Sequence, residues 1–100
     1  MQIDVKILTA ASYKGYQPAM QELVNVYYSG KYGKKDMVNA YAWAAVLAAR
    51  NDNVINSQAV MQQAEKEMSA AEKKKAKKTA ELLIKKIGSN SYYGSISTID

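Results

Sequence analysis

Two side chains that carry much of protein chemistry are missing from this sequence. None of its 100 residues is a cysteine or a histidine. The absence of cysteine excludes disulfides and thiolate metal sites, and it leaves the redox compartment undecided. The absence of histidine removes the side chain that titrates near neutral pH and the commonest ligand of transition metals. Histidine-containing catalytic triads and imidazole-based zinc sites are therefore excluded within these residues.

Helix breakers and long apolar runs are also scarce. There is one proline and there are five glycines, whereas residues that favour helices, such as alanine and lysine, are common. No apolar run approaches the roughly 18 residues that are needed to span a bilayer. Residues 1–6 lack the basic and apolar segments of a signal peptide. As the sequence stands we expect a cytoplasmic protein, or a periplasmic or secreted one if an export signal has been removed.

Apolar periodicity predicts five helices, separated by glycines and by polar clusters. They are expected at residues 3–15, 17–29, 36–50, 54–68 and 69–87. Asp36 is expected to cap the third helix, and Ser69 with Glu72 forms a capping box at the start of the fifth. The third helix is apolar nearly all round, which predicts that it is the most buried. The short turns indicate antiparallel neighbours and an all-α fold.

The second and third helices carry a spaced pattern in which each residue has a physical role. Small residues let the helices approach, larger ones fill the gap between them, a glycine relieves the turn and an aspartate caps the second helix. These residues are Ala19, Leu23, Tyr27, Gly30, Asp36, Ala40 and Trp43. The pattern resembles the Sel1-like repeat, which is related to the tetratricopeptide repeat. In addition, Met68-Ser69-Ala70-Ala71-Glu72 resembles the Met-Ser/Thr-Pro-Glu that opens the last helix pair of such proteins.

The resemblance implies an α-α superhelix, a short solenoid of antiparallel helix pairs, in a domain at residues 1–87. Residues 3–15 would be the second helix of a preceding repeat, residues 17–50 a complete repeat, and residues 53–87 a C-terminal capping helix pair. The composition of residues 88–100 separately predicts a flexible tail. The alternative is a tail that docks on its own groove or on a neighbour, because four exposed apolar residues are costly to leave in water: Tyr92, Tyr93, Ile96 and Ile99.

The sequence departs from the family pattern at three positions. Val24 stands where the family prefers glycine, Tyr32 replaces the second glycine of the loop, and Gly33 takes the usual valine position. The resemblance therefore predicts the helix pairing more firmly than the geometry of the loop.

The acidic residues do not form a pattern that is typical of a catalytic or metal site. Such sites need two or more carboxylates on converging surfaces, whereas the acids here are scattered. A phosphate-binding P-loop at residues 30–35 is disfavoured, because a helix precedes this loop and no serine or threonine follows its lysines. We therefore expect no catalysis, no cofactor and no metal.

Positive charge is concentrated near the end of the chain. The net charge is +5, and seven lysines lie close together: Lys73, Lys74, Lys75, Lys77, Lys78, Lys85 and Lys86. The simplest interpretation is the solvated outer face of a terminal cap, which end repeats require. Two others are a surface for an acidic protein and a surface for the phosphates of nucleic acid or lipid. Nucleic acid is disfavoured, because no arginine lies in this stretch to read bases.

Tyrosine is the most informative aromatic residue, since there are eight tyrosines and no phenylalanine. Tyr27 and Tyr41 fall at core positions of the pattern and are expected to pack. In related helical repeats the first helix of each pair lines a concave groove. The resemblance therefore implies four partner-binding residues: Gln21, Asn25, Tyr28 and Tyr32. The alternative is that these four are ordinary polar residues of the surface.

For function, the resemblance implies a protein-interaction module, an adaptor that binds a partner protein through a helical-repeat surface. Two alternatives stay open. One is an immunity- or inhibitor-type regulator of a bacterial effector enzyme, and the other is a basic scaffold for nucleic acid. Because helical repeats stack end to end, a first helix that exposes Ile3, Ile7 and Leu8 would also allow self-association.

Overall fold

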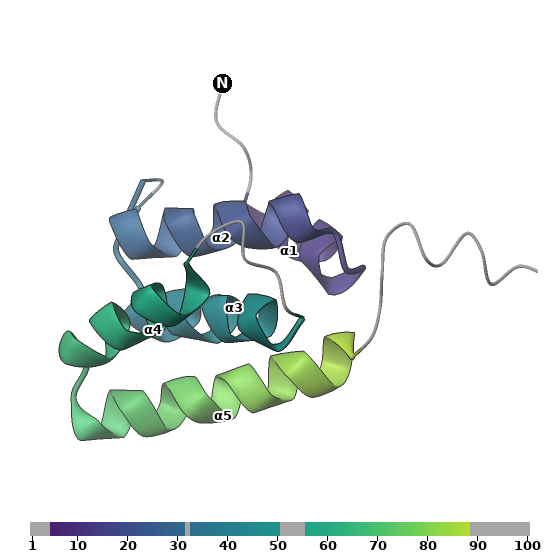
Figure 1. Cartoon of the computed structure of the whole chain (residues 1–100). Coiled ribbons are helices and arrows are strands. Elements are labelled where there is room, and N and C mark those ends of the chain that lie inside the picture. Colours follow the sequence, from purple (N-terminus) through teal and green to yellow (C-terminus); the bar gives the residue numbers. More distant parts are fainter. Residues whose placement is uncertain (1–4, 32, 51–55, 89–100) are drawn as a thin grey trace, which may run out of the picture.

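The computed structural model describes residues 5–31, 33–50 and 56–88, and these residues form five α-helices (Figure 1). The helices are α1 (Val5–Tyr13), α2 (Gln17–Ser29), α3 (Met37–Ala49), α4 (Ser57–Lys66) and α5 (Ala70–Ile87). No strand occurs in these ranges. The predicted all-α fold is confirmed. The expected tail lies outside the described residues, except for Gly88, which ends α5.

The ends of α2 follow from local sequence. Pro18 lies in its first turn, where the missing N–H would have no partner in the helix. Gly30 ends the helix in the left-handed conformation, with a φ of 72°, and its N–H donates to the carbonyl of Val26 over 2.9 Å. A Cβ at Gly30 would lie 3.1 Å from the backbone N of Lys35 and 3.2 Å from the carbonyl O of Gly33. Both the φ angle and the lack of space therefore favour glycine here.

A side-chain cap begins α3, as the sequence predicts. One carboxylate oxygen of Asp36 accepts a hydrogen bond from the backbone N–H of Asn39 over 3.0 Å. The other accepts from the side-chain amide of Asn39 over 2.7 Å. The cap satisfies a backbone N–H that has no partner within the helix.

The predicted capping box begins α5. The hydroxyl of Ser69 accepts from the backbone N–H of Glu72 over 3.2 Å, and the carboxylate of Glu72 accepts from the backbone N–H of Ser69 over 3.0 Å. Hydrogen bonds from the backbone and then the side chain of Ser69 lower the pKa of Glu72, because they favour its charged form. The box therefore holds most firmly when Glu72 is ionised.

Replacing Ser69 with alanine should lower the free energy of unfolding by about 1 kcal/mol, the usual effect of losing an N-cap. The pKa of Glu72 should rise toward its ordinary value of 4.5. Because the pKa of Glu72 is lower in the folded state than its ordinary value of 4.5, the stabilisation by Glu72 is complete above pH 4.5. It is lost as the pH falls below 4.5 and through the lowered pKa of the folded state. Urea unfolding at several pH values and NMR titration of the Glu72 carboxyl measure both effects. The control is Gln63→Ala, at an exposed polar side chain of α4 that is not an N-cap; an equal loss there would contradict the role of the cap.

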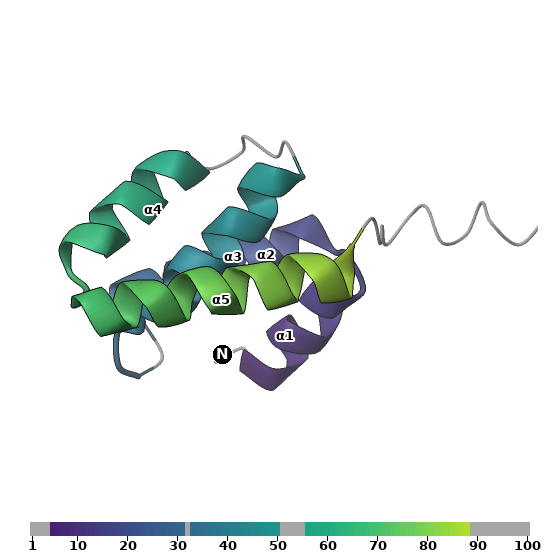
Figure 2. The same cartoon turned by 90° about the horizontal axis from the view of Figure 1, so that it is seen from below.

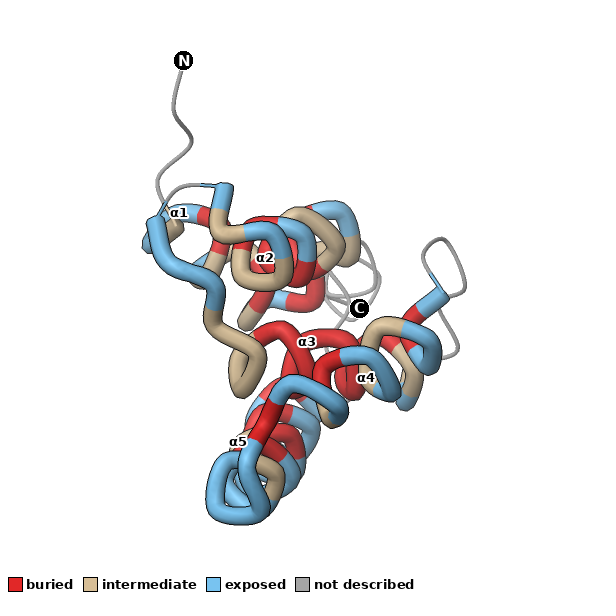
Figure 3. Tube along the Cα trace, turned by 90° about the vertical axis from the view of Figure 1, so that its left-hand side faces the viewer, coloured by how far each residue is buried: buried red, intermediate tan, exposed pale blue. Residues whose placement is uncertain are grey.

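α3 lies at the centre of the fold. It packs against α2, α4 and α5, while α1 packs on α2. An unbroken run of eight residues, 40–47, is buried in α3, and buried segments of the other helices turn toward it (Figure 3). The prediction that this helix is the most buried is confirmed.

An aromatic contact joins the first helix to the centre. The ring of Tyr13, at the end of α1, meets Trp43 of α3 edge to face, with 5.7 Å between ring centroids and 68° between planes. Trp43 is only 3% exposed. The predicted role of Trp43 in filling the space between helices is consistent with this burial.

The two helices expected as a capping pair are both present and are joined by a short turn at residues 67–69. Each has its main packing with α3, and the two helices diverge from their shared turn (Figure 2). The separate packing of α4 and α5 on α3 places α4 opposite α2 and the end of α5 near α1.

No helix within the described ranges is long and apolar enough to cross a membrane.

Candidate groove between α2 and α4

A shallow hollow of about 450 Å³ lies between α2 and α4. It is lined by Pro18, Gln21, Glu22, Val24, Asn25 and Tyr28 of α2 and by Val60 of α4. We call it the α2–α4 groove. The spacing of the α2 residues, three or four apart, places them on one face of the helix. Three of the four predicted partner-binding residues, Gln21, Asn25 and Tyr28, therefore lie together, and Tyr32 lies outside the described residues.

The bottom of the groove is apolar. Val24 is 3% exposed and belongs to the hydrophobic core, and Val60 is half-buried against that core. Val24 is among the residues that line the groove, so its side chain contributes to this apolar bottom.

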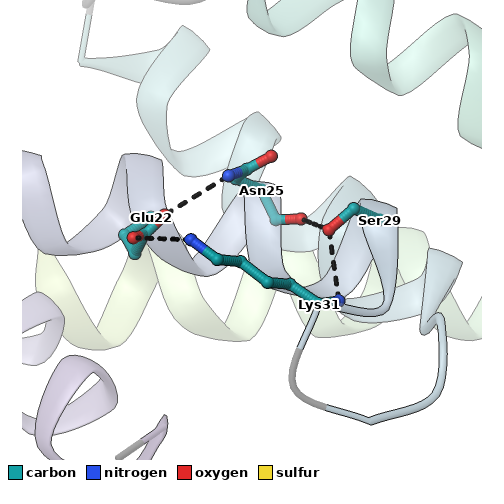
Figure 4. Close-up of polar contacts among 4 residues, drawn as sticks. All are labelled: Glu22, Asn25, Ser29 and Lys31. Atoms are coloured by element: carbon teal, nitrogen blue, oxygen red, sulfur yellow. Dashed lines mark hydrogen bonds and ion pairs between the residues drawn. The ribbon is translucent and has the colours of Figure 1, made fainter. Parts of the chain in front are cut away.

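Glu22 and Asn25 line the α2 side of the groove, and Figure 4 shows their polar contacts with each other and with Ser29 and Lys31, which lie outside the lining. Glu22 accepts a hydrogen bond from the side-chain amide of Asn25 over 3.4 Å, and its other oxygen lies 3.9 Å from Nζ of Lys31. The hydroxyl of Ser29 donates to the carbonyl of Asn25 over 2.7 Å and accepts from the backbone N–H of Lys31 over 3.2 Å. The contacts of Glu22 are long and solvent-exposed, so they contribute little and a ligand can replace them at small cost.

This set of groups suits the recognition of a peptide. The carboxamides of Gln21 and Asn25 each contain donor and acceptor groups of the kind that pair with a peptide backbone. The phenol of Tyr28 adds a large contact area with a polar end. Glu22 is the single carboxylate in the lining. Within the described ranges no three potential metal ligands among Asp, Glu, His and Cys lie close enough together to hold a metal ion.

Sequence reasoning missed four residues that line the groove: Pro18, Glu22, Val24 and Val60. Glu22 could have been found from its spacing of three residues before Asn25, on the same helical face. Val60 had no comparable signal, because its place opposite α2 depends on how α4 packs on α3. Pro18 was predicted only as a helix-opening residue, and it lies at one end of the groove.

The residues that carry the resemblance to the repeat lie mainly in the core rather than in the groove. Ala19, Leu23, Ala40 and Trp43 are buried, and Tyr27 is half-buried against them. Burial, followed by the charge of Asp36, raises the pKa of Tyr27. Tyr41 is 7% exposed, and burial, followed by the charge of Glu65, raises its pKa. Both phenols therefore stay neutral at neutral pH, and the prediction that they pack is confirmed.

The lysines of α5 point away from the core. Lys73 is half-buried and the other six are exposed, and none of the seven forms an ion pair with a carboxylate of the described residues. These positions are consistent with a solvated outer face and equally with a surface for an acidic partner.

The prediction for the exposed face of the first helix was partly wrong. Ile7 is 67% exposed, as expected, but Leu8 is 9% exposed and belongs to the hydrophobic core. Successive residues of a helix point about 100° apart, and in α1 this turns Leu8 into the core while Ile7 stays on the outer face. Ile3 lies outside the described residues. Among the described residues of α1, Ile7 is therefore the one large apolar side chain that is exposed.

Comparison with protein-family models, with curated proteins and with solved structures found no match. The relation to the Sel1-like repeat therefore stays a resemblance of spaced residues.

Proposed function

We propose that the chain is a Sel1-like helical-repeat domain that binds a segment of a partner protein in the α2–α4 groove. The observation that carries this proposal is the gathering of Gln21, Asn25 and Tyr28 around one hollow, with Val60 of α4 on its other side. In this interpretation α2 and α4 are the first helices of two successive pairs, and they present the concave face on which such repeats bind.

The composition of the groove supports a protein ligand. An apolar side chain of the partner would be buried against Val24 and Val60, and such burial contributes roughly 1.5–3 kcal/mol for a fully covered side chain. The amides beside it would fix the direction of the bound segment through hydrogen bonds. Because these groups stand on helices that pack on α3, little conformational entropy is lost when they bind.

Replacing side chains of the groove with alanine should reduce the amount of partner protein that the chain captures from an extract of the source cell. We expect Gln21→Ala/Asn25→Ala and Tyr28→Ala each to reduce capture of the same partner about tenfold, the effect of a residue central to an interface. The measurement is quantitative mass spectrometry of the captured proteins against the unaltered chain.

The matched control is Gln58→Ala/Gln62→Ala, which removes two exposed side-chain amides of α4 that do not line the groove. Capture by this control should equal that of the unaltered chain. Equal capture by all three variants, with helicity retained, would remove the groove as the binding site.

A basic scaffold for nucleic acid is the second candidate, favoured by the exposed lysines of α5. The two functions differ in their response to salt. Nucleic-acid binding weakens steeply as salt rises, because counterions are released from the phosphates, whereas binding in the α2–α4 groove should respond mildly.

A further inference from the structure

A second hollow, of about 490 Å³, lies where the end of α1 meets the C-terminal half of α5. Its lining consists of Tyr13 of α1 and of Thr79, Leu82, Leu83, Lys85 and Lys86 of α5. We call it the α1–α5 hollow. None of these residues lines the α2–α4 groove, and Figure 2 shows α1 lying beside this half of α5.

The α1–α5 hollow combines an exposed apolar side chain with positive charge. Leu82 is 59% exposed, although its neighbour Leu83 is 7% exposed and packs in the core. Lys85 and Lys86 are exposed, and the lining contains no acidic residue. A leucine left in water gains by being covered, and the two ammonium groups gain by meeting carboxylates as they lose water.

One wall of the hollow is held in place before any ligand arrives. The ring of Tyr13 rests against Trp43 in the core, with 5.7 Å between centroids. Nζ of Lys86 lies 4.9 Å from the centre of the same ring, a cation–π distance. The contact with Trp43 therefore fixes the Tyr13 ring, so little ordering of this ring is required when a ligand binds.

We infer that the α1–α5 hollow is a docking surface for a segment of a partner protein that carries both acidic and apolar side chains. Charge complementarity selects the acidic groups, since two lysines and no acid line the hollow. Leu82 and Leu83 select the apolar groups. A nucleic acid would leave Leu82 without an apolar partner, and its bases would find the Tyr13 ring already in contact with Lys86.

Two synthetic peptides of about ten residues, long enough to span this half of α5 as a helix, test the inference. Both carry the same glutamates, and one has leucines on a single helical face where the other has serines. Fluorescence anisotropy with the full chain should show that the leucine peptide binds about tenfold more tightly, because only that peptide covers Leu82. Leu82→Ser should abolish this difference.

The charge requirement is tested on the same helix. Lys85→Glu/Lys86→Glu should weaken binding of the leucine peptide about tenfold. The matched control, Lys74→Glu/Lys78→Glu, makes the same change in net charge at exposed lysines outside the lining, and should weaken binding no more than about threefold. Circular dichroism checks the fold of each variant. If the glutamate variant unfolds, Lys85→Gln/Lys86→Gln replaces it.

Three results would overturn the inference. Equal affinity for the two peptides would show that the apolar side chains have no role. Equal losses in the two charge variants would show general attraction to a basic helix. Displacement of the peptide by a DNA oligonucleotide of the same charge, at equal concentration, would assign the surface to nucleic acid. Tyr28→Ala should leave peptide binding unchanged, so failure here and failure of the α2–α4 groove are distinguishable.

Discussion

Replacing Trp43 with alanine should lower the free energy of unfolding by about 3–5 kcal/mol, the usual range for removing a buried aromatic side chain. The indole is 3% exposed in the middle of α3 and meets the ring of Tyr13 on α1. Its removal opens a cavity in the helix that all later helices pack against, and it also removes the contact with α1. Since small domains are stable by only about 5–15 kcal/mol, this single change should bring the protein close to unfolding at moderate temperature.

Urea unfolding followed by far-UV circular dichroism measures this effect. In the unaltered chain Trp43 is the only tryptophan, so its fluorescence reports its own burial and should shift to the red on unfolding. The matched control is Leu82→Ala, where the side chain is 59% exposed and the expected change is about 0.5 kcal/mol or less. A loss below about 1 kcal/mol for Trp43→Ala would contradict the central position of this residue.

Enlarging Ala40 should have the second largest effect. Its side chain is completely buried on α3, in a helix that packs against three others. Protein interiors are close-packed, so the additional carbons of leucine must push a neighbouring helix away or adopt a strained rotamer. We expect Ala40→Leu to lower the free energy of unfolding by about 1–3 kcal/mol, even though the residue becomes more apolar.

The control is Ala49→Leu, which makes the same change at the exposed end of the same helix. It should alter stability by about 0.5 kcal/mol at most. Thermal unfolding by calorimetry compares the two variants with the unaltered chain. If Ala40→Leu proved as stable as the control, the small side chain would not be what lets the helices approach.

Much of the fold could be predicted because its signals are local. The caps at Asp36 and Ser69 and the terminating Gly30 each act within one helical turn, so a single sequence displays them in full. The depth of α3 also follows from local sequence, since a helix that is apolar on every side has no face to offer to water.

The candidate sites could be predicted only in part. The spacing of Gln21, Asn25 and Tyr28 shows that they share a face of α2, whichever helix lies opposite. No such signal places Val60 across from them or Tyr13 beside Lys86, because these pairs are far apart in the sequence. The same limit explains the error at Leu8, since the periodicity of a short helix does not say which of two neighbouring apolar residues turns inward.

The sequence by itself thus determined the helices, their ends and the buried character of α3, because hydrogen bonding and apolar periodicity operate over a few residues. Only the tertiary structure decided that α4 and α5 diverge across α3 and that Leu82 is left exposed beside two lysines. The physical reason is that the angle between two packed helices depends on how side chains of both interlock. The α2–α4 groove and the α1–α5 hollow are both products of that packing.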